Sequence, residues 1–255
     1  MDFLGKLRGL FGNNQAESRI KVKVDGRNIR YSVPTNFARE AHEIIQLSEY
    51  DLTKIDFDKV SLVVDIGAHV GMFSALMRSH YPAAIIHAFE PLSVNVALLE
   101  RNFKGDASVV VRPYGLAKSE QEATIWLAPY YGQGAASTKR TVDHSGDFEV
   151  VRFKPALAEI SALGNRIDIL KIDTEGHELS LLRALDPMLH RVDAIFLEVH
   201  SSLALANILS LLDCRFIPVH FGEGRGNRYK PLFVSRDAVA EKRLSATIAP
   251  DIYYD

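Results

Sequence analysis

The chain has 255 residues, of which 47% are hydrophobic and 24% charged, with a formal net charge of −2. This composition is typical of an ordinary folded domain, and a chain of this length can bury enough apolar surface to fold without disulfides or a metal. The near-neutral charge gives no general attraction to nucleic acid or acidic lipid. Cys214 is the single cysteine, which excludes an intrachain disulfide and a cysteine-built zinc site, and we expect its thiol to be buried.

Residues 1–19 are expected to form a leader and linker. Apolar side chains recur there at helical spacing, with Lys6 and Arg8 between them: Phe3, Leu4, Leu7, Leu10 and Phe11. Such a segment can dock on a membrane surface or a partner, although three glycines in the first twelve residues weaken a helix, so a frayed or self-packed leader is the favoured interpretation. No apolar run reaches the ~20 residues that span a bilayer, and the start lacks the apolar core of a secretion signal, so we expect a cytoplasmic location.

Residues 20–59 predict a strand and helix extension. Ile20, Val22 and Val24 alternate with polar residues, which is the period of a strand. The turn signal Asp25–Gly26 then indicates a hairpin, and a helical stretch follows around residues 38–47.

The sequence pattern changes over residues 60–240. Short apolar runs alternate there with helical patterns, as in a parallel sheet covered by helices. We predict an α/β domain with helices on both faces of seven strands: Leu62–Asp65, Ile85–Phe89, Ser108–Arg112, Ile167–Ile172, Ala194–Val199, Arg215–Phe221 and Pro231–Val234. The last two should be antiparallel neighbours, since the turn between them is too short for a crossover helix. Residues 116–155 interrupt the alternation and predict an insertion on the substrate side. Its aromatic residues Trp126, Tyr130 and Tyr131 could stack on a flat acceptor or equally pack within the insertion. Residues 241–255 are expected to be a tail.

The first predicted strand of that domain runs directly into a glycine-containing loop with the spacing D-x-G-x-x-x-G. Gly67 permits a tight turn and close approach of a ligand, and Gly71 lets the next helix pack near the strand. Free amides at a helix N-terminus can bind a carboxylate as well as a phosphate. His69 stands where a dinucleotide fingerprint has its second glycine. The loop predicts a ligand-binding corner around Asp65, Gly67, His69 and Gly71, with a purely structural corner as the alternative.

Glu90 ends the second strand of the domain and is followed by Pro91. An acidic side chain at this position can accept hydrogen bonds from both hydroxyls of a ribose. A helix cap is the alternative, because proline favours the first helical position, but it leaves the glycine loop unexplained. The loop and Glu90 together predict a nucleoside pocket.

The strand Ile167–Ile172 ends in a cluster of ionisable residues. In open α/β sheets ligands bind beyond the carboxyl ends of the strands, so Asp173, Glu175 and His177 should lie at the mouth of the site. Glu178 is placed to cap the first turn of the following helix.

These motifs resemble those of the FkbM family of methyltransferases. The segments concerned are Val64–Ala68, Phe89–Pro91 and, most distinctively, Leu170–Glu178. The resemblance covers about residues 60–235 and includes Gly115–Ala117 and the region of Ser137, so Leu116 is also expected at the cofactor.

The resemblance implies a class I methyltransferase with a Rossmann-like sheet and S-adenosylmethionine as methyl donor. It also implies O-methylation of a hydroxyl on a sugar, glycan or natural product. His69 is a departure, since the family commonly has asparagine there. The residues expected to bind the cofactor are Asp65, Gly67, His69, Gly71, Glu90, Leu116 and Asp173.

Methyl transfer from a sulfonium is an in-line displacement, so the protein must align the acceptor and help to remove its proton. The candidates for the base are Asp173, Glu175, His177 and His200. Asp173 and Glu175 with Glu198 or His200 could also hold a divalent metal such as magnesium or manganese. No fixed ligand spacing supports such a site, and we predict none.

Two other functions stay open on the sequence. An NAD-dependent sugar oxidoreductase would share the fold, but His69 counts against it. A catalytically silent methyltransferase-like binding module would keep the pocket without turnover. The expected partner is a small-molecule or glycan acceptor and not a nucleic acid.

Overall fold

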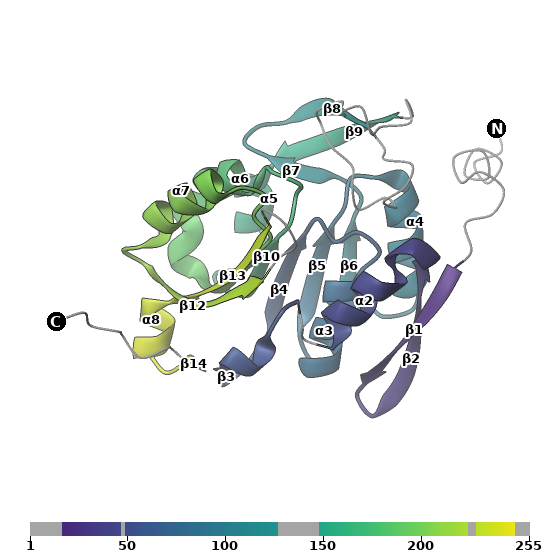
Figure 1. The fold of residues 1–255 in the computed structure, drawn as a ribbon, viewed down its shortest axis with the longest axis horizontal. Coiled ribbons are helices and arrows are strands. Elements are labelled where there is room, and N and C mark those ends of the chain that lie inside the picture. Colours follow the sequence, from purple (N-terminus) through teal and green to yellow (C-terminus); the bar gives the residue numbers. More distant parts are fainter. Residues whose placement is uncertain (1–16, 47–48, 127–147, 224–227, 248–255) are drawn as a thin grey trace.

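A seven-stranded sheet lies at the centre of the computed structural model, which describes residues 17–46, 49–126, 148–223 and 228–247. Its strands run in the order β12–β13–β11–β10–β4–β5–β6 (Figure 1). They are β4 (Leu62–Ile66), β5 (Ile85–Phe89), β6 (Val109–Arg112), β10 (Ile167–Ile172), β11 (Val192–Leu197), β12 (Phe216–Glu223) and β13 (Tyr229–Ser235). β13 pairs antiparallel with β11 and β12, and the remaining neighbours pair in parallel. The predicted α/β sheet and its antiparallel terminal hairpin are confirmed.

Helices cover both faces of this sheet. On one face lie α2 (Ala38–Ile45), α3 (Met72–His80), α4 (Ser93–Asn102) and α8 (Arg236–Ala240). On the other lie α5 (Ala156–Ser161), α6 (Glu178–Leu185), η5 (Asp186–Arg191) and α7 (Ser202–Leu212). Successive side chains of a strand point to opposite faces, so Val63 joins one core and Val64 the other. Burial on both faces explains why these strands are continuous apolar runs.

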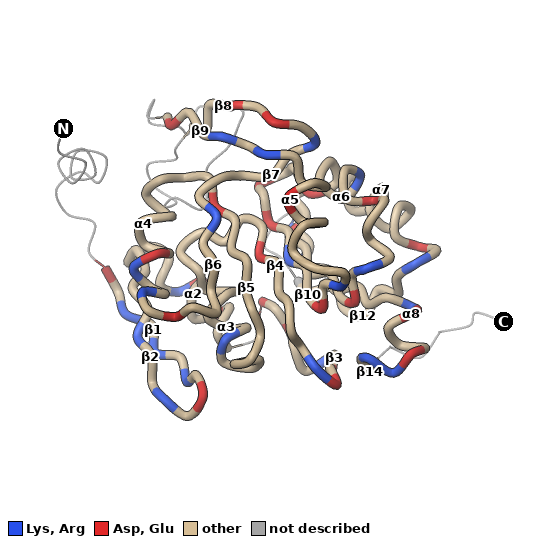
Figure 2. The backbone as a smooth tube through the Cα atoms, turned by 180° about the vertical axis from the view of Figure 1, so that it is seen from behind, with Lys and Arg blue, Asp and Glu red and all other residues tan. Residues whose placement is uncertain are grey.

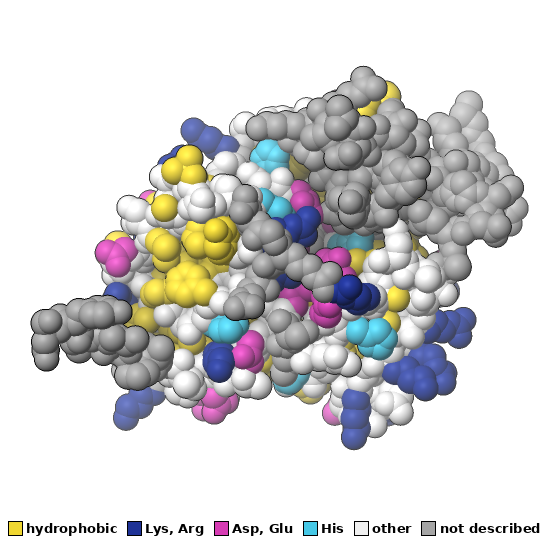
Figure 3. All heavy atoms as spheres, viewed as in Figure 1, with side chains coloured by type: hydrophobic (Ala, Val, Ile, Leu, Met, Phe, Trp, Pro, Cys, Tyr) yellow, Lys and Arg dark blue, Asp and Glu magenta, His cyan; other side chains and the backbone are white. Residues whose placement is uncertain are grey.

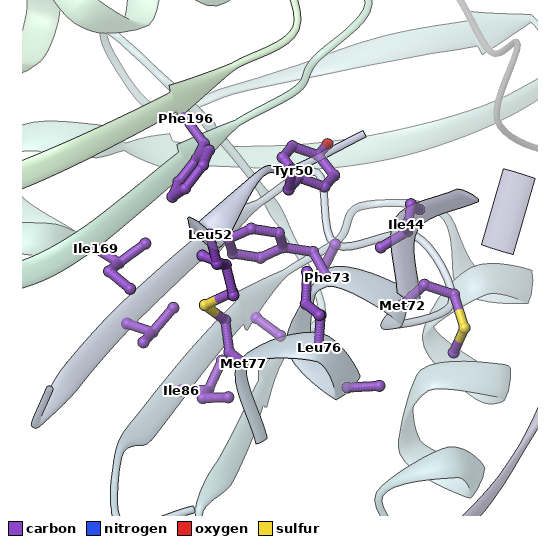
Figure 4. Close-up of a cluster of buried hydrophobic side chains, with 14 of the residues drawn as sticks. Ile44, Tyr50, Leu52, Met72, Phe73, Leu76, Met77, Ile86, Ile169 and Phe196 are labelled. Atoms are coloured by element: carbon purple, nitrogen blue, oxygen red, sulfur yellow. The ribbon is translucent and has the colours of Figure 1, made fainter. Parts of the chain in front are cut away.

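The N-terminal extension packs into the same core as the sheet. It consists of β1 (Glu17–Val24), β2 (Arg27–Pro34), η2 (Thr35–Phe37), α2, η3 (Leu52–Lys54) and β3 (Ile55–Phe57). Ile44 and Tyr50 lie against Met72 and Phe73 of α3 in one buried cluster (Figure 4). Residues 20–59 are therefore part of the domain's core rather than a separately packed unit.

The predicted insertion forms a second, three-stranded sheet from β7 (Gly115–Ala117), β9 (Phe148–Pro155) and β8 (Gln121–Trp126), in that order. Figure 1 shows it beyond the upper ends of the central strands. The residues between β8 and β9, including Tyr130, Tyr131 and Ser137, lie outside the described part of the chain, as do residues 1–16 of the predicted leader.

Four expectations about boundaries and burial were wrong. β1 begins at Glu17, so residues 17–19 belong to a strand and not to a linker. β14 (Leu244–Ala246) pairs antiparallel with β3, so part of the expected tail belongs to the fold. β11 begins two residues earlier than predicted because η5 leads directly into it. Cys214 is exposed in the connection from α7 to β12. No helix in the described ranges is long and apolar enough to cross a membrane.

Candidate active site

A cavity of about 290 Å³ opens at the carboxyl ends of β4, β5, β10 and β11. Gly67, Glu90, Asp173 and Glu198, which follow these four strands in turn, all line it. The N-terminal extension supplies one wall, and β7, β8 and β9 supply another. A cavity of this size is at the lower limit of ordinary small-molecule pockets, which are roughly 300–1,000 Å³, and it lies where open α/β sheets bind their ligands.

The turn after β4 brings the backbone very close to β10. Gly67 has a φ of +77°, and a Cβ atom there would lie 1.7 Å from the carbonyl oxygen of Asp173. The backbone amides of Gly67 and Ala68 both donate to the carbonyl of Phe89, at 3.0 Å each. The sequence suggested that free amides of this loop bind a carboxylate, but these two amides are already paired. The loop instead allows a ligand to come close to the backbone.

Two residues expected to bind the cofactor do not line the cavity. Asp65 is fully buried, accepts a hydrogen bond from the hydroxyl of Ser74 at 2.7 Å, and lies 3.3 Å from the ammonium of Lys171. Gly71 has a φ of +91°, and a Cβ atom there would collide with Phe103 and Leu99 of the α4 region. Asp65 thus stabilises the loop through Ser74 and Lys171, and the absence of a side chain at Gly71 lets α4 pack closely.

Lys171 is the residue of this region that the sequence did not single out. It is 3% exposed and donates a hydrogen bond to the carbonyl of Gly67 at 2.6 Å. Burial works to lower the pKa of Lys171, but the carboxylates of Asp65 and Asp173 outweigh it and raise that pKa. A charged residue inside an otherwise apolar strand was the available signal, because such residues are rarely buried unless paired.

Glu90 is buried and already accepts three hydrogen bonds. Its Oε2 accepts from the backbone amide of His69 at 2.9 Å. Its Oε1 accepts from the backbone amide of Leu92 at 3.0 Å and from the side chain of Asn95 at 3.2 Å. A carboxylate has about four acceptor positions, so this arrangement leaves Glu90 fewer free positions than the two hydroxyls of a ribose would need, and its binding of the cofactor stays a prediction. One position, on Oε2, is open.

His69 is neutral and faces the cavity. Its ring packs edge-on against Phe37 of η2, with ring centroids 4.4 Å apart, and its backbone is held at a φ of +52°. Burial, with a smaller contribution from Lys171, lowers the pKa of His69 to about 3. Its Nε2 is shielded from solvent and has no hydrogen-bond partner among the described residues. The N-terminal extension thus fixes the loop residue that departs from the family pattern.

The cluster after β10 lies at the cavity as predicted, with Asp173, Glu175 and His177 among its lining residues. Glu178 accepts hydrogen bonds from the backbone amides of Thr174 at 3.0 Å and Gly176 at 2.9 Å. Both amides lie in the turn before α6, and α6 has no side-chain cap within the described chain, so Glu178 stabilises that turn and does not cap the first turn of the helix as predicted. Burial raises the pKa of Asp173 well above its ordinary range; Lys171 acts in the opposite direction, and Glu198 adds to the rise.

His200 does not line the cavity. Its Nε2 lies 3.2 Å from a carboxylate oxygen of Glu175 and 3.5 Å from one of Glu198. Burial works to lower the pKa of His200, but the carboxylates of Glu175 and Glu178 raise it to about 10. An imidazolium cannot accept a proton, so the geometry does not support His200 as the base and makes it a positioning residue for the carboxylates.

Asp173, Glu175 and His200 also bring three ligand atoms within 4.8 Å of one another. Since His200 would first have to lose its proton to coordinate an ion, this group does not lead us to assign a metal site.

Two further residues at the cavity, Glu49 and Arg228, were not singled out from the sequence. Glu49 lies in the N-terminal extension, with one carboxylate oxygen 2.8 Å from the ammonium of Lys230 and the other buried without a hydrogen-bond partner in the described chain. Arg228 lies 3.0 Å from Glu198. Leu116, which the resemblance had placed at the cofactor, lines the cavity from β7. Only tertiary packing brings these segments together.

Comparison with known sequences places this arrangement in a family. Residues 65–218 match the methyltransferase FkbM domain family. The chain belongs to the FkbM methyltransferase family. The match covers the glycine turn, Glu90, the cluster after β10 and His200, whereas the N-terminal extension and β13 lie outside it.

Three relatives illustrate the range of the family. Methyltransferase 1 of Beauveria bassiana is 28% identical over 54% of this chain and 62% of its own length. The hexuronic acid methyltransferase AglP of Haloferax volcanii is 24% identical over 75% of this chain and 78% of its own length. The 31-O-demethyl-FK506 methyltransferase FkbM of Streptomyces tacrolimicus is 27% identical over 59% and 70%. The chain thus spans less than two thirds of the Beauveria protein.

Among solved structures, the putative methyltransferase yhhF of Escherichia coli has a TM-score of 0.51 at 14% identity. It covers 86% of this chain and 99% of its own length, which supports the class I methyltransferase fold.

Proposed function

We propose that this chain transfers a methyl group from S-adenosylmethionine to a hydroxyl of a sugar, glycan or natural product. Membership of the FkbM family supports methyl transfer, and the names of the relatives AglP, a hexuronic acid methyltransferase, and FkbM, a 31-O-demethyl-FK506 methyltransferase, support acceptors of these classes. The observation that carries the proposal is the cavity itself. Glu90, which can accept a hydrogen bond from a ribose, and the acidic residues at Asp173 line the same space.

The residues present fit this cofactor. Glu90 keeps one acceptor position for a ribose hydroxyl, and the shielded Nε2 of His69 lacks a partner within the described residues. When bound, S-adenosylmethionine supplies an electrophilic methyl group on a positively charged sulfur. The carboxylates of Asp173, Glu175 and Glu198 along the cavity favour a cation there.

The chain's own residues then act on the acceptor. Asp173 is the base of this proposal, because its side chain lines the cavity in which the acceptor hydroxyl would lie. Lys171 holds the side chain of Asp173 from the buried side, at 3.7 Å. The N-terminal extension and the small β7–β9–β8 sheet form the walls of the space above the strand ends.

The test has two parts. Isothermal titration with S-adenosylmethionine, S-adenosylhomocysteine and NAD should give binding of the first two only, and binding of NAD alone would refute the proposal. Incubation with panels of glycans, lipid-linked sugars and small molecules, read by mass spectrometry, should show one acceptor that gains the mass of a CH2 group. Cofactor binding without turnover on any panel would instead support a silent binding module.

A further inference from the structure

The outer face of the β1–β2 hairpin is an unpaired basic surface. Arg19, Lys21 and Lys23 of β1 and Arg30 of β2 are exposed, and none of the four forms an ion pair with a described residue. Lys21 and Arg30 are directly opposite each other in the strand register. Like charges in that position destabilise a sheet, so these cations do not serve the stability of the hairpin.

The opposite face of the hairpin is firmly held. Ile20, Val22 and Tyr31 are buried in the core against the helices. The side chain of Asn102 on α4 also bonds both the amide and the carbonyl of Ser32, at 2.8 and 2.9 Å. The cations are therefore presented on a fixed surface, visible along β1 and β2 in Figure 2 and at the lower right of Figure 3.

The charge of the hairpin contrasts with that of the chain. Between residues 17 and 34 there are five basic and two acidic residues, while the whole chain has a formal net charge of −2. One of the two acids, Glu17, is already paired with Arg101 at 2.7 Å. A partner that fits this face must carry a high density of negative charge.

We propose that this outer face docks the protein on a membrane that contains anionic lipid. Residues 1–12, which precede the hairpin in the sequence, include Lys6 and Arg8 together with the apolar residues Phe3, Leu4, Leu7, Leu10 and Phe11. Anionic headgroups attract clustered Lys and Arg residues, and the acyl boundary accepts apolar side chains. A nucleic acid would satisfy the basic face but would not use the apolar residues that precede it in the sequence, which favours the membrane.

The test is co-sedimentation of the full chain with vesicles of phosphatidylcholine alone or mixed with phosphatidylglycerol. Binding should require phosphatidylglycerol and weaken as salt is raised. The double variant Lys21→Gln/Arg30→Gln should lower the partition coefficient on the order of tenfold. The matched control is Lys59→Gln/Lys104→Gln, which removes two exposed cations without an ion pair elsewhere on the described surface. It should bind as the unchanged protein does.

Three outcomes would overturn the proposal: no binding to the mixed vesicles, equal loss in both double variants, or release of the protein from vesicles by a short nucleic-acid duplex at equimolar charge. Titration with S-adenosylhomocysteine should be unaffected by Lys21→Gln/Arg30→Gln, which keeps this test separate from that of the proposed function.

A second, independent observation concerns Asn95 in the first turn of α4. Its side chain is 1% exposed and lines the cavity beside Glu90. Its amide nitrogen donates to Glu90, while its Oδ1 is shielded from solvent and accepts no hydrogen bond from any described residue. A buried acceptor without a donor is costly, and such groups in native folds call for an explanation.

Glu90 has a single open acceptor position, whereas a ribose brings two hydroxyl donors. We infer that Asn95 Oδ1 accepts the second hydroxyl, so that Glu90 and Asn95 share the ribose between them. This inference rests on the proposed function, because it assumes a nucleoside cofactor in the cavity.

The experiment compares S-adenosylhomocysteine with its 2′-deoxy and 3′-deoxy analogues by isothermal titration. Asn95→Ala should weaken binding of S-adenosylhomocysteine on the order of tenfold, and this loss should disappear for the analogue that lacks the hydroxyl bound by Asn95. Asn102→Ala is the control on the same helix, because its side chain bonds only backbone groups of Ser32 and Val70. It should affect all three ligands equally.

Failure of the unchanged protein to bind S-adenosylhomocysteine would refute the proposed function. Binding by the unchanged protein, with the same loss for all three ligands in Asn95→Ala, would refute only the role of Asn95. If the alanine variant does not fold, the unchanged protein still tests the inference: loss of either hydroxyl should weaken binding, and an affinity that is indifferent to one of the two hydroxyls would refute the role of Asn95.

Discussion

Lys171 places its ammonium nitrogen 2.6 Å from the carbonyl oxygen of Gly67, across the boundary between β10 and the turn that follows β4. The same ammonium lies 3.3 Å from Asp65 and 3.7 Å from Asp173. A single buried cation thus joins the glycine turn, the strand below it and the proposed base.

Replacement of Lys171 tests this relationship. Lys171→Met leaves Asp65 buried without its cation, and breaking a buried pair on one side costs about 3–5 kcal/mol of unfolding free energy. Urea denaturation should show this loss, and the double variant Lys171→Met/Asp65→Asn should recover part of it. If Lys171→Met lowers the free energy of unfolding by less than about 1 kcal/mol, Lys171 does not stabilise the turn after β4.

Gly67→Ala should abolish measurable binding of S-adenosylhomocysteine, because the new Cβ would lie 1.7 Å from the carbonyl oxygen of Asp173. Gly26→Ala is a matched control, since Gly26 has a φ of +78° but no atom within 4 Å of its added Cβ. The control should lose only about 1–2 kcal/mol of stability from the left-handed backbone and bind normally. If Gly67→Ala and Gly26→Ala weakened binding equally, backbone strain and not the contact with β10 would be the cause of the loss.

Glu90→Ala removes the acceptor of three hydrogen bonds and the open position beside them. We expect affinity for S-adenosylhomocysteine to fall by about 1–3 kcal/mol, and the loop to be less stable. The control is Glu100→Ala, an exposed site on α4, the helix that follows Glu90, and it should change neither the affinity nor the stability. Titration calorimetry and thermal unfolding check both parts, and an unchanged affinity in Glu90→Ala would remove Glu90 from the site.

His69 should make the fold sensitive to acid. Its pKa in the folded protein is lowered from an ordinary 6.5 to about 3, so the unfolded chain binds a proton more readily below pH 6.5. The stability that comes from the neutral ring is therefore present above about pH 6.5 and lost as pH falls toward 3, by up to about 1.4 kcal/mol per pH unit.

His69→Asn, which introduces the residue that the family commonly has, removes this dependence. The difference in unfolding free energy between the two proteins should change as pH is lowered from about 7 to about 4, with the unchanged protein losing more. A difference that is constant with pH would show that His69 is not buried in its neutral form.

Asp173→Asn should leave the fold intact but slow methyl transfer about 10²–10⁴-fold, the usual contribution of a general base. His200→Gln is the informative comparison. With a pKa of about 10, His200 is already protonated at neutral pH, so its loss should act only through the position of Glu175 and cost less. Single-turnover kinetics on the acceptor found in the panels would distinguish them, and full activity in Asp173→Asn would refute its role.

The sequence by itself determined the sheet and the place of the site. Strand and helix periodicities are local, so the seven strands and the antiparallel hairpin of β12 and β13 followed from spacing. Parallel strands gather their carboxyl ends at one edge, so Glu90, Asp173 and Glu175 could be expected at one cavity before any coordinates were known.

Only the tertiary structure decided what each of these side chains can do. Whether Glu90 has acceptor positions left depends on amides of His69 and Leu92 and on the side chain of Asn95. The protonation of His69 and His200 depends on burial and on carboxylates from other segments. Hydrogen-bond saturation and pKa are set by the whole surroundings of a group, and those surroundings come from residues far apart in the chain.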